Sequence, residues 1–212
     1  MRALMRLIGA ICYSLSLGIL NKCVVPHVGV IGLASFLAPC VGFFARPSSC
    51  IGVWLIRTLF SLTGFSLSTL FVHIPTLAGS LVLSSDSKLL KISVPLFCMG
   101  AFIAHPVGAE SFLYTLYWII PAILGCFSGT SIFLRSLAST LTTHAVGSCI
   151  FLYTHTTTST FWNLLIAQVW YERLLSTCVL VVAYKVITHV ITVLSAISFE
   201  RKTICQNRLA SL

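Results

Sequence analysis

The chain has 212 residues, of which 58% are hydrophobic and only 8% are charged. An average soluble domain carries roughly 25% charged residues, so this composition excludes a soluble surface and implies lipid as the main solvent. Only helices and closed barrels satisfy their backbone in lipid, and the long unbroken apolar runs lack the alternation of barrel strands. The sequence predicts an all-α polytopic membrane protein, one transmembrane domain over residues 1–212 with about six helices.

The net charge of +9 comes from scattered Lys and Arg residues. They form no basic stripe, so we expect contacts with lipid headgroups and no nucleic-acid partner. The 9 cysteines form no C-x-x-C pair, and most lie in apolar runs, which is typical of small hydrophobic side chains. The sequence identifies no metal site and no cofactor.

The first predicted span is Ala3–Leu20. Arg2 and Arg6 precede an apolar run, as in a signal peptide, but no A-x-A cleavage site follows. We therefore expect an uncleaved first span.

The next two predicted spans are Pro26–Ala45 and Ile51–Val72. The third contains Arg57, and its end is predicted near Pro75. Residues 76–91 include the most polar stretch of the chain and predict a loop with a partial helix.

The stretch Lys91–Ser128 is too long for one span of ~20 residues. It is broken at His105-Pro106 and Gly108, and it fits either two short spans or one span with an entering half-helix. Counted as one crossing, it gives six spans and places both basic termini in the cytoplasm.

The fifth and sixth predicted spans are Leu137–Tyr153 and Leu174–Ile197. Between them, Thr154–Thr160 forms a polar external loop, and an interfacial helix from about Leu164 precedes the last crossing. The protein is thus expected in the inner or plasma membrane.

Ionisable groups at bilayer depth cost roughly 2.5–3.5 kcal/mol on insertion, so they tend to face a cavity or one another. His105 and Glu110 flank the Pro106 break, where freed backbone groups line many transporter sites. The alternative is a surface turn between two short helices.

Two further clusters follow helical spacing. Thr140, His144 and Ser148 share one face, as do the polar residues around Glu172. Inter-helix hydrogen bonds or a buried ion pair are the alternative to ligand contact. Arg173 does not face Glu172 on a helix, so the expected partners of Glu172 are Arg135 and Arg57. Lys185 and His189 either snorkel or face a cavity. The predicted ligand-binding residues are His144, Glu172, His105, Gln168 and Trp162.

Ala10, Ser14 and Gly18 form a small-residue face on the first span. Such a face lets another helix approach, either within the chain or from a partner subunit. With this face, its size, its six expected spans and its later polar residues, the chain resembles the substrate-binding S components of energy-coupling-factor vitamin transporters. The resemblance implies docking of a membrane coupling subunit and binding of a small ligand near the outer face.

The leading functional hypothesis is transport of a small solute, by the protein itself or as the substrate-binding membrane subunit of a transporter. The chain carries none of the common soluble-enzyme motifs, such as G-x-S-x-G or H-E-x-x-H. Two alternatives stay open: a membrane-embedded enzyme acting on lipid or peptide bonds, and a non-catalytic membrane assembly protein. One enclosed pocket would favour transport, a nucleophile–base pair an enzyme, and dispersed polar pairs a structural role.

Overall fold

The computed structural model describes most of the chain, namely residues 2–20, 37–59, 67–84, 88–110, 115–127, 129, 131–154 and 172–197. Every regular element within these ranges is a helix, and none is a strand. The predicted all-α class is therefore confirmed for the described part of the chain.

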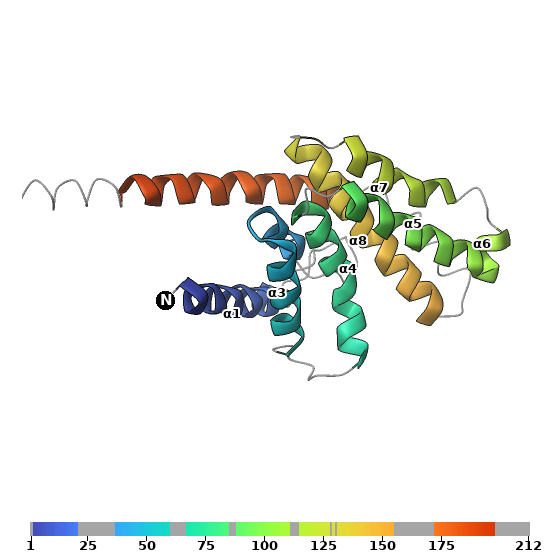
Figure 1. The fold of residues 1–212 in the computed structure, drawn as a ribbon, viewed down its shortest axis with the longest axis horizontal. Helices are drawn as coiled ribbons and strands as arrows, with labels where there is room; N and C mark the ends of the chain where they lie inside the picture. The colour runs from blue at the N-terminus through green and yellow to red at the C-terminus, as the bar shows by residue number, and fades with distance from the viewer. Residues whose placement is uncertain are drawn as a thin grey trace, which may run out of the picture.

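The helices follow one another along the chain as labelled in Figure 1. They are α1 (Arg2–Leu20), the 3-10 helix η1 (Ala38–Phe43), α3 (Pro47–Leu59), α4 (Leu67–Ser84), α5 (Lys88–Ala104), α6 (Pro106–Glu110), α7 (Thr115–Phe127) and α8 (Ile132–Thr154). A further helix, Glu172–Ile197, is drawn in orange and is called the 172–197 helix below.

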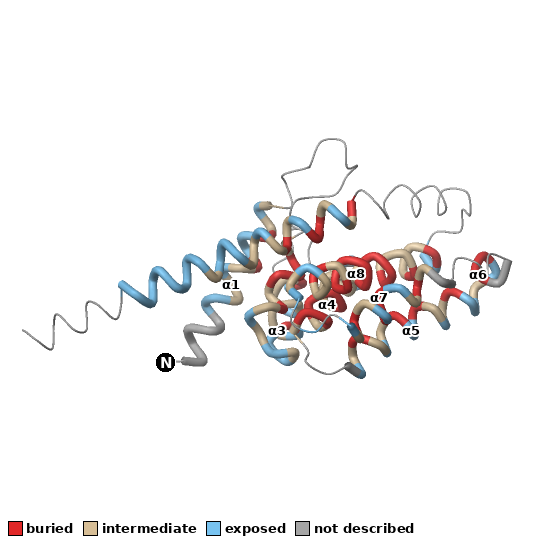
Figure 2. The backbone as a smooth tube through the Cα atoms, turned by 90° about the horizontal axis from the view of Figure 1, so that it is seen from above, coloured by how far each residue is buried: buried red, intermediate tan, exposed pale blue. Residues whose placement is uncertain are grey.

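The most buried helix is α8, which packs against α4, α5 and α7 and appears largely red in Figure 2. Its buried face is made of small and hydroxyl-bearing residues, such as Ala138 and Thr142. The Thr142 hydroxyl donates to the Ala138 carbonyl at 2.7 Å. Hydroxyls that bond their own helix backbone can be buried without leaving an unpaired donor, so a polar helix can lie inside this bundle.

A glycine sets the distance between α4 and α8. A Cβ atom on Gly79 would lie 2.1 Å from Thr143 Oγ1 and 3.2 Å from the Ser139 carbonyl oxygen. The Ser139 hydroxyl donates to the Gly79 carbonyl at 2.8 Å. Small residues at such contacts allow close backbone approach, which is typical of helix pairs in membranes.

An aromatic pair fills the space between α5 and α7. The rings of Phe102 and Trp118 lie 5.0 Å apart, and both side chains are fully buried. The Cys149 thiol of α8 donates to the Cys98 carbonyl of α5 at 3.3 Å. These contacts fix α5 and α7 as a helical pair against α8.

The third predicted span is wrong as a single helix. The structure has α3 ending at Leu59 and α4 beginning at Leu67, and the two helices run side by side in opposite directions. Pro75 lies inside α4 and does not end it, and the partial helix predicted within residues 76–91 is the last part of α4, which ends at Ser84. A proline is tolerated within a membrane helix when neighbouring groups accommodate the missing hydrogen bond, and here its ring packs beside Gly147.

The break predicted within Lys91–Ser128 is confirmed. Helix α5 ends at Ala104, the five-residue α6 begins at Pro106, and α7 follows. Helices α5 and α7 have 17 and 13 residues, which corresponds to lengths of about 25 and 20 Å. Both are shorter than the ~30 Å hydrocarbon core of a bilayer, and whether they form two short spans or one span with an entering half-helix stays a prediction.

The 172–197 helix stands apart from the bundle over much of its length (Figure 1). Among the described helices it alone is both long and apolar enough to cross a membrane. In Figure 1 its Ile197 end and the Arg2 end of α1 extend towards the same side of the molecule. The first and last predicted spans correspond to single helices, whereas residues 26–36 of the second lie outside the described residues, and residues 38–43 form the 3-10 helix η1. The count of six crossings stays a prediction.

Candidate functional site

The central feature of the site is a histidine held between two helices. His144 of α8 is only 5% exposed, and its Nδ1 shares a hydrogen bond with the hydroxyl of Tyr117 on α7. The two rings meet edge to face, with centroids 5.6 Å apart. Because a buried imidazole needs a polar partner, the Tyr117 hydroxyl fixes its orientation.

An ion pair lies at the start of the 172–197 helix. Arg173 Nη2 lies 3.2 Å from Glu172 Oε2, and Glu172 is 7% exposed. The sequence prediction that Arg173 would not reach Glu172 is therefore wrong. Side chains of adjacent helical residues diverge, but the long arginine side chain bends back to the carboxylate, because burial makes an unpaired charge costly.

The two cations predicted to pair with Glu172 have other partners. Arg135 donates to the Leu83 carbonyl and stands 6.0 Å from the centroid of the Phe43 ring. Arg57 donates to Thr76 Oγ1 at 3.3 Å. Each of these arginines links its own helix to a neighbouring helix by a hydrogen bond. Neither of them pairs with Glu172.

Arg173 connects the ion pair to the histidine. Its charge interacts electrostatically with both His144 and Tyr117. The hydroxyls of Thr140 on α8 and Thr177 on the 172–197 helix lie 2.9 Å apart and are buried. The polar cluster, as we name it, lies where α7, α8 and the 172–197 helix meet and consists of Tyr117, Thr140, His144, Glu172, Arg173 and Thr177.

One donor in the polar cluster stays unused. Arg173 Nε is buried and has no hydrogen-bond partner among the described residues. Buried donors are almost always satisfied, so an orphaned one marks a place where a further acceptor is expected.

Ser148 and His144 form a second contact that matters for the enzyme alternative. Ser148 Oγ lies 3.5 Å from His144 Nε2, one turn along α8. An activated nucleophile usually lies about 2.6–3.2 Å from its base and faces free N–H donors that hold the oxyanion. Ser148 lies within α8, where backbone N–H groups are already bonded to carbonyls one turn earlier. Within α8 the pair therefore has no backbone N–H donors beside it that could hold an oxyanion.

His105 lies at a distance from the polar cluster. It precedes α6, where its Nδ1 accepts a hydrogen bond from the Val107 N–H at 3.3 Å, and its ring packs edge-on against Tyr153 at 5.1 Å. Tyr153 is nine residues beyond His144, or about 14 Å along α8. The structure thus gives His105 a local role in ending α5 and does not bring it to the polar cluster.

The other predicted positions fall outside what can be placed. Gln168 and Trp162 lie outside the described residues, and the same holds for the side chain of Glu110. Of the five predicted ligand-binding residues, the structure brings His144 and Glu172 into one cluster, joined through Arg173. Their role as ligand contacts stays a prediction.

The small-residue face of α1 is partly used within the chain. Ser14 is buried and donates to the Ala10 carbonyl at 2.8 Å. The neighbouring Tyr13 hydroxyl donates to the Leu37 carbonyl at 2.9 Å. A Cβ atom on Gly18 would meet nothing within 4 Å, so open space remains at that end of the face.

Sequence reasoning missed Tyr117, Arg173 and Thr177 as members of the site. Tyr117 and Thr177 lie within apolar runs that spacing rules treat as plain spans. A usable signal was present, because a tyrosine or threonine buried in a membrane helix must find a partner for its hydroxyl. Such a rule identifies candidates but not which helix supplies the partner.

Comparison with protein-family models, curated proteins and solved structures gives no match for this chain.

Proposed function

We propose that this protein is a polytopic membrane protein that binds a small polar solute at the polar cluster and carries it across the bilayer. The observation that carries the proposal is that Glu172 and His144 are buried and Arg173 is largely covered, beside the Thr140–Thr177 contact between α8 and the 172–197 helix. Ionisable residues among membrane helices are costly and most often mark substrate or ion pathways.

The unsatisfied Arg173 Nε suggests the chemical class of the solute. A guanidinium presents donors in a planar fork that matches a carboxylate. Its Nη2 already contacts Glu172, so a solute carboxylate would accept from the Nε side. The hydroxyls of Tyr117 and Thr177 add polar groups beside it, which suits a small carboxylate-bearing solute.

The proposal requires the polar cluster to open. His144 and Glu172 are nearly covered in this structure, as in the closed state of an alternating-access cycle. Near the start of the 172–197 helix, the Thr177 hydroxyl contacts the Thr140 hydroxyl of α8. A small displacement of this end would expose the ion pair to solute.

Binding of small carboxylates to the purified protein tests the proposal. Monocarboxylates and their methyl esters would be compared by thermal shift and by uptake into proteoliposomes. We expect stabilisation by the acids and not by the esters. Arg173→Gln and His144→Phe should each abolish the response, because one removes the cation and the other the imidazole.

Two control variants define the outcome. Lys185→Gln removes an exposed cation from the same helix, and His105→Ala removes the histidine that packs on Tyr153. Both should respond like the unmodified protein. Equal responses to acids and esters, or equal losses in the control variants, would refute a carboxylate site at the polar cluster.

A second candidate function is a membrane assembly subunit, and the surface of α1 favours it. Ile8, Leu15 and Ile19 are exposed on this helix, and Gly18 has open space beside it. The resemblance to S components predicts a coupling subunit docked on this helix. Because a Cβ atom on Gly18 meets nothing within 4 Å among the described residues, we expect Gly18→Leu to fold normally and to lose a co-purifying subunit. Unchanged co-purification would refute docking at Gly18.

A further inference from the structure

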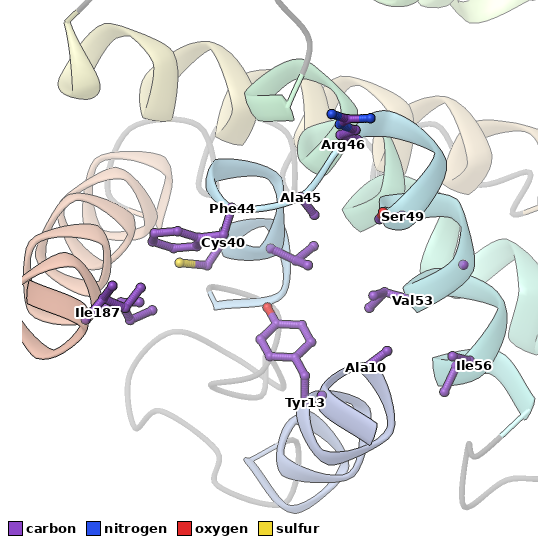
Figure 3. Close-up of a pocket in the computed structure, with 14 residues that line it drawn as sticks. Ala10, Tyr13, Cys40, Phe44, Ala45, Arg46, Ser49, Val53, Ile56 and Ile187 are labelled. Carbon is purple, nitrogen blue, oxygen red and sulfur yellow. The ribbon is translucent and has the colours of Figure 1, made fainter. Parts of the chain in front are cut away.

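A cavity of about 820 Å³ is lined by a set of described residues that includes no member of the polar cluster (Figure 3). Residues of α1, η1, α3 and the 172–197 helix line it, together with the segment that joins η1 to α3. Ligand sites commonly have volumes of about 300–1,000 Å³, so the cavity is large enough for a ligand. Of the predicted ligand-binding residues that the structure describes, namely His105, His144 and Glu172, none lines it.

The walls of the cavity are apolar, and small residues create its space. Gly9 and Ala10 come from α1, and Gly52 comes from the facing α3. Ile187 and Ile191 belong to the part of the 172–197 helix that stands away from the bundle. The cavity therefore borders an exposed apolar surface. Its expected ligand is an apolar molecule and not a water-soluble one.

The polar groups of the cavity are unevenly placed. Figure 3 shows Arg46 and Ser49 at one end and Tyr13 at the other. Arg46 is exposed and has no ion-pair partner among the described residues, and no lining residue is acidic. The Tyr13 hydroxyl already donates to backbone carbonyls. One end thus carries an unpaired cation, and the rest offers apolar contact.

We propose that this cavity binds one anionic phospholipid, with an acyl chain along the apolar walls and its phosphate on Arg46. Basic residues beside pockets between membrane helices recognise anionic headgroups by charge. An acyl chain matches the aliphatic surfaces of Ile187 and Ile191, while the glycines on α1 and α3 provide its width. The inference depends on the membrane location of the chain and not on solute transport.

The test counts lipids bound to the full-length protein. The protein would be delipidated in detergent, titrated with phosphatidylglycerol or phosphatidylcholine, and examined by native mass spectrometry. We expect one tightly bound phosphatidylglycerol. Arg46→Gln should weaken it about fivefold and should weaken phosphatidylcholine much less, because the choline charge offsets the phosphate charge. Lys185→Gln, which removes an exposed cation that does not line the cavity, should change neither.

Filling the cavity provides a second test. A Cβ atom on Gly52 or on Gly9 meets nothing within 4 Å, so Gly52→Leu and Gly9→Leu should fold and occupy the space from opposite walls. Each should abolish tight binding of phosphatidylglycerol. Gly100→Leu is the matched control, because Gly100 is exposed on α5 and also has no neighbour within 4 Å.

Four results would overturn the proposal. They are normal lipid binding in both filled variants, an equal loss in Gly100→Leu, an unchanged preference for phosphatidylglycerol in Arg46→Gln, and displacement of the phospholipid by an equal concentration of oleate. Circular dichroism would establish that each variant is folded. If both filled variants misfold, the comparison of Arg46→Gln with Lys185→Gln still tests whether Arg46 binds the anionic headgroup. A solute response that persists in Arg46→Gln would show that the two sites are separate.

Discussion

The helix α8 and the 172–197 helix differ in a way that reverses the rule for soluble proteins. Helix α8 contains serines, threonines and a histidine and is the most buried helix of the bundle. The 172–197 helix is richer in valine, leucine and isoleucine, and most of these side chains are exposed. In water the apolar helix would be covered and the polar helix would face solvent. The reversal is the pattern expected where hydrocarbon surrounds the apolar helix.

The two ends of the 172–197 helix sharpen this contrast. Near its start, Thr177 and Leu180 are fully buried, and Tyr184 packs against Phe43 with ring centroids 4.8 Å apart. Beyond it, Val190 and Leu194 are 47% and 60% exposed. Packing with the bundle thus gives way to exposed apolar surface within one continuous helix. The same helix contributes residues to the polar cluster and to a wall of the cavity shown in Figure 3.

The largest effect should come from placing charge on the exposed end. Val190→Arg with Leu194→Arg puts two cations on one helical face. Each arginine at the centre of a membrane helix costs about 2.5–3.5 kcal/mol on insertion scales, so the pair should cost about 5–7 kcal/mol. We expect the helix to fail to insert, measured by glycosylation of an acceptor site placed after Ile197.

The matched control changes the same positions without adding charge. Val190→Ala with Leu194→Ala should insert normally, because lipid tolerates the smaller apolar side chains. A glycosylation pattern equal to that of the unmodified protein in the arginine variant would show that Val190 and Leu194 do not lie in hydrocarbon, and it would contradict the comparison. Loss of a co-purifying protein in the alanine variant would instead identify these side chains as contacts to a partner.

A smaller effect should follow from separating α4 and α8. Gly79→Leu brings its Cβ into the space of Thr143 and close to the Ser139 carbonyl. Overpacking of this kind costs about 1–3 kcal/mol. We expect a lower midpoint of thermal unfolding in detergent, followed by size-exclusion chromatography with fluorescence detection.

Gly100→Leu serves as the control, because it adds the same side chain where no atom lies within 4 Å. It should unfold at the same temperature as the unmodified protein. Adding Thr143→Ala to Gly79→Leu should recover part of the loss. Equal midpoints for Gly79→Leu and Gly100→Leu would show that close contact between α4 and α8 does not stabilise the fold.

Patterns within one helix could be predicted from the sequence, and contacts between helices could not. Helical spacing identifies the shared face of Thr140, His144 and Ser148, and the first two contact other helices through hydrogen bonds. Such hydrogen bonds between helices are what the sequence analysis gave as the alternative to ligand contact. Their partner Tyr117 is 27 residues from His144, and no local period encodes such a distance.

The error in the third span has a physical cause. Hydropathy averages over a window, so it does not detect a reversal of direction inside an apolar run. The reversal falls between Leu59 and Leu67, in a stretch that contains Gly64 and three hydroxyl-bearing residues. That composition is a turn signal, whereas Pro75, which was given more weight, lies within α4. The ion pair of Glu172 with Arg173 shows a similar limit, since spacing rules describe where side chains start and not how far a long one bends.

The smallest effect should come from the hydroxyl contact that joins the two compared helices. Thr140 and Thr177 lie 2.9 Å apart, but Thr140 also donates to the Leu137 carbonyl at 3.0 Å, and Thr177 donates to the Arg173 carbonyl at 2.7 Å. Two hydroxyl hydrogens thus serve three contacts. Removing either hydroxyl leaves the other bonded to its own helix, so no donor is left without an acceptor.

We therefore expect a coupling free energy of about 0.6 kcal/mol, the average for polar contacts between membrane helices. A double-mutant cycle of Thr140→Val and Thr177→Val, followed by reversible unfolding in SDS, measures it. Thr142→Val replaces Thr140→Val in the control cycle, because the Thr142 hydroxyl is equally buried and donates only to Ala138. The control coupling should be zero. A coupling above about 1.7 kcal/mol between Thr140 and Thr177 would exceed the largest values for such contacts. The start of the 172–197 helix would then be held too firmly for the opening that solute binding requires.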